Sequence, residues 1–217
     1  MAERTFRDGV RAMAPLVVAV VAFAISFGVL ARAAGFGWFA PIVMSATTFA
    51  GSAQFAAVSV LGDGGTVAAA VAAALLLNAR YAPIGVSVAP WLSGSAWSRL
   101  LHAQLVVDES WAIAAEGEGR FNRRVLFGAG LVLYVAWVAG TAVGAVLGQA
   151  LGDPATLGLD AAFGALFLGL LVPIAKDRLH VLAALLGAGI ALALTPIAPA
   201  GVPIVAAGAA CLLGLKR

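Results

Sequence analysis

The sequence predicts an all-α, polytopic integral membrane protein, a helical bundle of about seven membrane segments with one or more broken or re-entrant helices. Hydrophobic residues make up 63% of the 217 residues and charged residues only 11%, whereas soluble domains carry about a quarter charged residues. The mean hydropathy is +1.04. Long uncharged runs are separated by short charged gaps, as is typical of membrane spans. We expect a single transmembrane domain over residues 1–217.

Charge and cysteine content narrow the class further. The net charge of +3 does not indicate nucleic-acid binding, because most Lys and Arg lie in the short gaps between apolar runs, where they orient a protein in the lipid bilayer. The single cysteine, Cys211, excludes an internal disulfide, and packing as a small hydrophobic side chain is its simplest role.

The first apolar run predicts an uncleaved span over residues 10–30. Arg4, Arg7 and Arg11 precede the apolar residues 12–31, as in a signal peptide, but this run is longer than the roughly 7–15 residues of a signal-peptide core. A second span is expected over residues 39–61, and a glycine-rich turn at residues 62–65 ends it.

Polar residues interrupt the second span in the stretch SATTFAGSAQF, residues 45–55. Lipid penalises such residues, so we expect them to face other protein or a wet cavity. One interpretation makes four residues the wall of a central binding site: Phe49, Gly51, Ser52 and Gln54. The alternative is that the small residues only let helices pack closely, while Gln54 hydrogen-bonds two of them.

The third span begins near residue 66 and changes character in the sequence NARYAP, residues 78–83. A proline lacks the backbone N–H and frees a carbonyl one turn earlier, so a break is expected here. Arg80 and Asn78 beside such a break are candidates for a functional site, because charges inside a membrane are costly. The alternative is that the span ends at residue 77 and Arg80 extends to the interface.

Two adjacent carboxylates, Asp108 and Glu109, lie in the next apolar stretch. Left unpaired there, they would cost several kcal/mol. We therefore expect pairing with Arg80 or Arg99, protonation of one carboxylate, or a position at the surface. On a continuous helix, Glu109 shares a face with His102. We expect Asp108 to be the paired, structural carboxylate and Glu109 to be the one that binds and releases a proton.

Four further spans complete the chain. They are expected over residues 125–151, 160–175, 179–194 and 202–215. Within the first of these, Gly140, Gly144 and Gly148 repeat every four residues and predict a seam for close helix packing.

Basic clusters predict which loops face the cytoplasm. They lie at the N-terminus and at residues 120–124, 176–178 and 216–217, whereas the gaps at residues 152–159 and 195–203 carry no Lys or Arg. Both termini are therefore expected to be cytoplasmic. Because an even number of crossings must then precede Arg120, residues 100–115 are expected to cross the membrane as well.

Four features in this order resemble the AzlC-type branched-chain amino acid permeases, the large subunits of two-component amino acid exporters. They are a first span with a proline, FAGSAQF at residues 49–55, N-x-R at residues 78–80 and D-E-S at residues 108–110. The resemblance covers most of the chain. It implies a small hydrophobic partner subunit of the AzlD type, export of apolar amino acids such as valine or leucine, and no cofactor. The family pattern usually reads N-L-R-H, but Tyr81 stands in place of the histidine, so a proton-coupling role does not carry over to that position.

The resulting hypothesis is a single-domain secondary transporter in a bacterial-type cytoplasmic membrane, which exports branched-chain or other apolar amino acids and is coupled to protons. Arg80 with Asn78 would hold the substrate carboxylate, because a guanidinium matches it bidentately. Asp108 or Glu109 would meet the ammonium group or carry a proton. One alternative is a scaffold subunit whose partner transports. The other is a membrane-embedded enzyme using His102 with Asp108 or Glu109, although the sequence has only two histidines and no HExxH or GxSxG motif.

Overall fold

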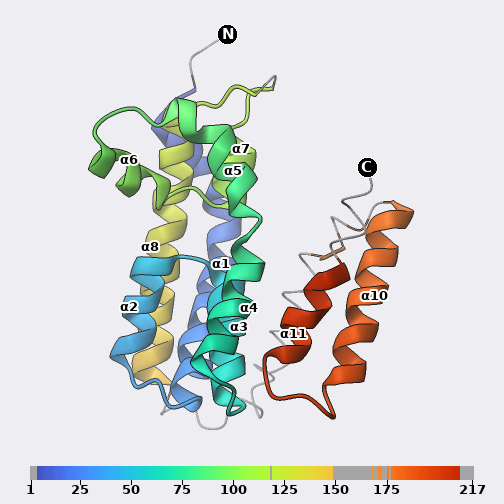
Figure 1. Cartoon of the computed structure of the whole chain (residues 1–217). Coiled ribbons are helices and arrows are strands. Elements are labelled where there is room, and N and C mark those ends of the chain that lie inside the picture. Colours follow the sequence, from blue (N-terminus) through green and yellow to red (C-terminus); the bar gives the residue numbers. More distant parts are fainter. Residues whose placement is uncertain are drawn as a thin grey trace.

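Two long helices, α1 (Phe6–Ala33) and α8 (Arg123–Leu147), lie against each other along their length (Figure 1). They run in the same direction, because Gly9 near the start of α1 lies beside Val125 near the start of α8. At about 1.5 Å per residue, both are longer than the roughly 30 Å of a bilayer's hydrocarbon core, and both are apolar enough to cross it. The rest of the chain is arranged around this pair.

The part of the chain that the structure describes is helical. The computed structural model describes residues 4–117, 119–148, 168, 171–172, 175 and 177–210. Over these residues the regular secondary structure consists of helices, apart from one isolated β-bridge between Ala115 and Phe121. The predicted fold class, a polytopic helical membrane protein with broken or re-entrant helices, is confirmed. The span predicted over residues 160–175 lies outside the described residues except at single positions.

Glycines allow α1 and α8 to approach closely. A Cβ atom added at Gly144 would lie 2.1 Å from the backbone oxygen of Ile25 in α1. Gly140 and Gly148, one turn before and one turn after, also face the backbone of α1. At each of these positions a larger side chain would meet main-chain atoms, which cannot move aside as a flexible side chain can.

The prediction of a single crossing over residues 39–61 is wrong. These residues form a re-entrant hairpin of two half-helices, α2 (Phe39–Thr48) and α3 (Gly51–Gly62), which we call the first hairpin. Both of its ends lie where α1 ends, because Gly62 packs against Ala34. Two apolar half-helices in sequence have the same hydropathy as one span, so the pattern of apolar residues does not separate the two cases.

The third predicted span is a broken helix, as the sequence indicates. α4 (Val67–Asn78) is followed by α5 (Tyr81–Val88) and a 3₁₀ turn (Ala89–Trp91). The two parts are bent by 48° and together are long and apolar enough to cross a membrane. α4 begins where the first hairpin ends, and Val88 packs in one cluster with Val125 at the start of α8. This broken span therefore runs opposite to α1 and α8.

The predicted crossing by residues 100–115 is also wrong, because these residues belong to a second hairpin. It consists of α6 (Ala96–Ala103) and α7 (Asp108–Ala114). Both of its ends lie at the start of α8. Arg123 donates a hydrogen bond to Ser93 just before α6, and the Asn122 N–H donates to the Ala114 carbonyl at 2.8 Å.

The two hairpins follow spans of opposite direction, so the chain contains two inverted units. α1 is followed by the first hairpin at one end of the bundle, and the α4–α5 span is followed by the second hairpin at the other end (Figure 1). Two full crossings therefore precede Arg120. The number of crossings before Arg120 is therefore even, as predicted, and the two crossings are α1 and the broken span.

The described C-terminal part contributes α10 (Arg178–Leu194) and α11 (Val202–Ala207). α10 coincides with the span predicted over residues 179–194. α11 begins the span predicted over residues 202–215, whose last five residues lie outside the described part. α11 packs against α4, and Gly208 just after it lies beside Leu76.

Candidate functional site

A buried hydrogen-bond cluster fixes the first hairpin to α8. The Gln54 side chain is fully buried and accepts hydrogen bonds from the Trp137 indole at 3.0 Å and from the Ala50 N–H at 3.1 Å. Its amide nitrogen donates to the Ser45 hydroxyl at 2.9 Å, which in turn lies 2.8 Å from the Thr141 hydroxyl. Because polar groups in an apolar interior are costly unless paired, this cluster holds the hairpin in one position.

Side chains also satisfy carbonyls that the end of α2 leaves free. The last turn of a helix has carbonyls without partners inside that helix. In α2, Ala46 accepts a hydrogen bond from the Tyr134 hydroxyl at 2.8 Å, and Thr47 accepts one from the Gln104 amide at 2.9 Å. The chain then reverses at Phe49, whose φ of 42° is left-handed and whose ring packs edge-on against Tyr134. Since Gln104 follows α6, the tips of the two hairpins meet here, near the middle of α8.

Ser110, the last residue of the D-E-S motif, supports the tip of the second hairpin. Its buried hydroxyl accepts a hydrogen bond from the Val107 N–H at 2.9 Å and donates one to the Leu105 carbonyl at 2.9 Å. The Trp111 indole donates to the Ser87 hydroxyl of α5 at 2.9 Å. The start of α7 is therefore held beside the broken span.

Arg80 lies at the break between α4 and α5 and forms an ion pair with Asp108, the first residue of α7. The distance from its Nη2 to Oδ2 of Asp108 is 3.0 Å. The same nitrogen donates to the Ser52 hydroxyl of α3 at 3.2 Å, and the guanidinium lies over the Tyr81 ring. Each partner of the ion pair keeps 35% of its side-chain surface exposed, so both charges are accessible to a ligand. Of the alternatives left open for Asp108, the structure shows pairing with Arg80.

A cavity of about 120 Å³, which we call the central cavity, lies beside this ion pair. The half-helices α3 and α5 begin at it, with Gly51 and Tyr81 as first residues and both in its lining. A helix N-terminus carries roughly half a positive charge, so the two N-termini and Arg80 form a positive side of the cavity, whereas Asp108 and Glu109 supply the negative charges of its lining. Apolar side chains form the other wall: Val20, Phe23, Phe49, Val107, Leu133 and Trp137.

The structure brings together most of the residues that the sequence singles out for substrate or proton binding. The central cavity is lined by Phe49, Gly51, Ser52, Arg80, Asp108 and Glu109. Asn78 instead lines a larger cavity between α5 and α6, and Gln54 lines neither cavity. The two interpretations of the polar stretch in the first hairpin therefore apply to different residues. Gln54 hydrogen-bonds neighbouring helices, whereas Phe49, Gly51 and Ser52 line the central cavity.

His102 and Glu109 do not share a helix face, contrary to the expectation from a continuous helix. α6 ends at Ala103 and α7 begins at Asp108, so the two side chains belong to different arms of the second hairpin. The His102 ring stacks on Phe127 of α8, with 4.2 Å between ring centroids, whereas Glu109 lines the central cavity. The pairing of His102 with Glu109, one of the two that the enzyme alternative considered, is therefore not formed.

Sequence reasoning missed the contribution of α8 to the site. Tyr134, Trp137 and Thr141 all hydrogen-bond the first hairpin. Their spacings of three and four residues put them on one face of α8. Side chains with polar atoms on one face of an otherwise apolar helix are the signal that identifies such a contact surface.

The fold and the site together define the class: a polytopic membrane protein whose half-helices begin around a charged cavity inside the bundle, which is the construction of membrane transporters. The AzlC protein family matches residues 15–151 of the chain. This chain belongs to the AzlC family, and the resemblance found in its motifs is confirmed.

Relatives over most of the chain are membrane proteins. The chain is 34% identical over 209 residues to an uncharacterized membrane protein of Archaeoglobus fulgidus, covering 94% of this chain and 91% of that protein. It is 31% identical over 214 residues to the inner membrane protein YgaZ of Escherichia coli, covering 89% and 84%. It is 29% identical over 196 residues to the branched-chain amino acid transport protein AzlC of Bacillus subtilis, covering 87% and 75%. No solved structure matches the chain.

Proposed function

We propose that this protein is a secondary transporter that exports branched-chain or other apolar amino acids and binds them in the central cavity. The observation that carries the proposal is the part-exposed ion pair of Arg80 and Asp108, located where both hairpins and the broken span meet. A zwitterion can enter such a pair, because it offers each charge a new partner. Inverted units and half-helices that begin at a central site support transport rather than another membrane function.

In this proposal the substrate carboxylate binds Arg80 beside the start of α3. A guanidinium can bind a carboxylate bidentately, and the helix N-terminus adds positive charge. Asp108, released from Arg80, then meets the ammonium group. The aliphatic side chain lies against Phe23, Phe49 and Leu133, where burial of apolar surface favours valine and leucine over polar amino acids.

We assign proton coupling to Glu109. Arg80 pairs with Asp108, and Glu109 is the second carboxylate of the same cavity. Two neighbouring carboxylates repel each other when both are charged, so the one that is less compensated by a cation binds a proton more readily. Carboxylates that take up and release protons in this way drive transport in other membrane proteins.

Direction, partner and orientation complete the proposal. We propose export and a small partner subunit of the AzlD type, as the resemblance of the motifs implies. The relative from Bacillus subtilis, which is named for branched-chain amino acid transport, supports the substrate class. Basic residues near the N-terminus and at residues 120–124 favour a cytoplasmic position for the Arg123 end of the bundle. On this basis we propose a cytoplasmic membrane location with both termini inside.

Efflux from proteoliposomes tests the function. The full chain, alone and together with its small partner subunit, is reconstituted with internal leucine, valine or glutamate, and efflux is followed with and without an imposed pH gradient. We expect leucine and valine to leave faster than glutamate, and Arg80→Gln to abolish the difference. Absence of amino acid movement in both preparations would contradict the proposal. Movement that requires the partner and ignores Arg80→Gln would instead identify this chain as a scaffold.

A further inference from the structure

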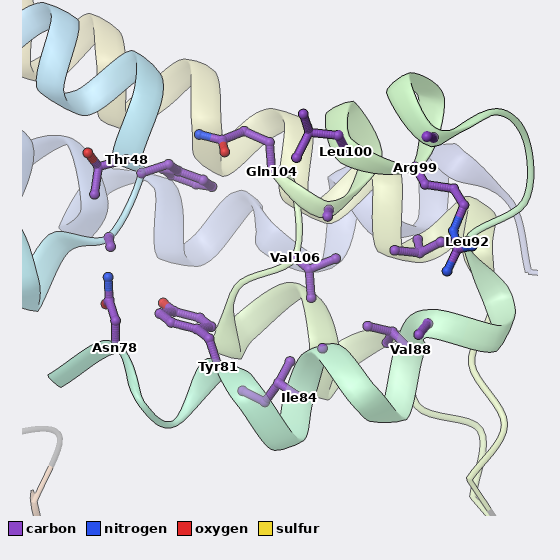
Figure 2. A pocket seen from close by; sticks show the side chains of 16 residues that line it. Thr48, Asn78, Tyr81, Ile84, Val88, Leu92, Arg99, Leu100, Gln104 and Val106 are labelled. Carbon is purple, nitrogen blue, oxygen red and sulfur yellow. The ribbon is translucent and has the colours of Figure 1, made fainter. Parts of the chain in front are cut away.

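A second cavity, of about 600 Å³, lies between α5 and α6, and we call it the α5–α6 cavity (Figure 2). Its lining shares Phe49 and Tyr81 with the central cavity, so these two aromatic side chains separate the two spaces. Asn78 and Tyr81 point toward the tip of the first hairpin at one end of the α5–α6 cavity, and Arg99 lies beside Leu92 at the other end (Figure 2).

The cavity has an apolar wall with polar groups at its two ends. Ile84, Val88 and Leu92 contribute to the wall. At the inner end, Asn78 Oδ1 is buried and has no hydrogen-bond partner among the described residues, so it is an acceptor that can receive an N–H donor. At the outer end, the exposed Arg99 supplies a positive charge near the start of α8. A pocket of this size, mostly apolar with a few placed polar groups, is the usual form of a site for a small organic ligand.

We propose that the α5–α6 cavity is a second binding section for the same class of ligand, an amino acid with an aliphatic side chain, and that substrate reaches the central cavity through it from the Arg123 end. This inference rests on the proposed function. Arg99 attracts the carboxylate, the apolar wall receives the aliphatic side chain, and Asn78 accepts a hydrogen bond from the ammonium group. Phe49 and Tyr81 then form the partition that the substrate crosses.

The packing of α6 is consistent with a passage of variable width. α6 has no buried residue, so its displacement away from α5 exposes little apolar surface that was previously covered. Its inner end is held by the hydrogen bond from Gln104 to Thr47 of the first hairpin and by the stacking of His102 on Phe127 of α8. The first hairpin is itself fixed to α8 through Gln54 and Trp137. The movable wall of the cavity is therefore α6, and the fixed wall is the first hairpin.

A cysteine at position 85 tests the passage. Gly85 lines the cavity, and a Cβ atom added there would meet no heavy atom within 4 Å, so cysteine fits in the cavity. In a Cys211→Ala background, Gly85→Cys is treated with a charged, membrane-impermeant methanethiosulfonate reagent from each side of the membrane in turn. We expect loss of leucine efflux only when the reagent is on the Arg123 side. Leucine at about ten times its half-saturating concentration should slow the labelling about tenfold, because it occupies the same space.

Glu116→Cys is the matched control, since Glu116 is exposed at the same Arg123 end and does not line the cavity. Its labelling should leave efflux unchanged. An independent variant is Arg99→Gln, which removes one exposed charge at the rim of the cavity. It should raise the half-saturating leucine concentration on the Arg123 side about three- to tenfold and leave the half-saturating concentration on the other side unchanged. Arg7→Gln removes an exposed arginine outside the cavity and should have no such effect.

Three results would overturn the inference. The first is labelling of Gly85→Cys that leucine does not slow, and the second is labelling by apolar but not by charged reagents, because the cavity then opens to lipid. The third is an equal change in the half-saturating leucine concentration in Arg99→Gln and Arg7→Gln. In each case the unlabelled protein still transports, so the proposed function stands. If the unlabelled protein moves no aliphatic amino acid, the proposed function itself fails.

Discussion

Gly144→Ala tests the close packing of α1 and α8 with the smallest possible change. The added Cβ atom would lie 2.1 Å from the oxygen, 2.9 Å from the carbonyl carbon and 3.0 Å from the Cα atom of Ile25. To restore the 3.4 Å at which ordinary van der Waals contact begins, the helices must separate by about 1.3 Å at this point. A gap of roughly 0.5–1 Å already loses a quarter to a half of each dispersion contact, so neighbouring contacts along the seam weaken as well.

We expect this substitution to lower the free energy of unfolding by about 3 kcal/mol, the upper part of the range for overpacked interiors, because backbone atoms cannot move aside. For a chain of this length the corresponding decrease in Tm is about 6–12 °C. Thermal unfolding of the purified protein in detergent, followed by circular dichroism, measures it. Gly189→Ala is the control, since its Cβ atom meets open space and alanine favours helix by about 1 kcal/mol over glycine.

The reasoning would be refuted if Gly144→Ala melted together with the wild-type protein, because α1 and α8 would then have room that the structure does not show. A stable Gly144→Ala protein with altered preference among leucine, valine and glutamate would refute the assignment in another way. The seam would in that case line the substrate path instead of only holding the two spans together.

Three further predictions concern the site and the topology. Arg80→Lys keeps the charge but loses the planar guanidinium, so it should weaken leucine binding at least about tenfold, or roughly 1.4 kcal/mol, in a detergent binding assay, and wild-type affinity would contradict the assignment. Glu109→Gln mimics the protonated carboxyl and should retain leucine exchange while losing net transport driven by a pH gradient; an unchanged pH dependence of transport in this variant would contradict the proton-coupling role of Glu109. Asp108→Asn should instead impair leucine binding or folding, because it leaves the Arg80 cation unpaired. Cysteines introduced at Ala96 and Glu116 should label from the same side of the membrane, because both ends of the second hairpin lie at the start of α8, and labelling from opposite sides would restore the predicted fourth crossing.

The sequence predicts which polar residues come together better than it predicts the path of the chain. Arg80 and Asp108 stand out because a charge in an apolar run must find a partner, and the structure pairs the two. The break after Asn78 follows from Pro83 and is present. Such local rules hold whichever way the surrounding helices run, so they need no knowledge of the tertiary structure.

Contacts between distant segments could not be predicted in the same way. Gln54 carries an amide that must be paired, yet its partner Trp137 lies 83 positions away, on another helix. Periodicity shows that Trp137 shares a face of α8 with Tyr134, but it does not show which segment covers that face. For the same reason the role of Gln104, which joins the two hairpin tips, depends on the folded arrangement.

The topology shows why a wrong count of crossings can leave the predicted orientation of the protein unchanged. A re-entrant hairpin contributes no crossing, so counting the first hairpin as one span created an odd number, and the charge pattern then required another crossing at residues 100–115. The structure removes both at once, because each stretch is a hairpin that returns to its own side. The two errors cancel because the hairpins belong to inverted units, one at each end of the bundle. The polar tips of the two hairpins meet toward the middle of the bundle. For this reason residues that would be costly in lipid, such as Ser52 and Asp108, lie beside one cavity instead.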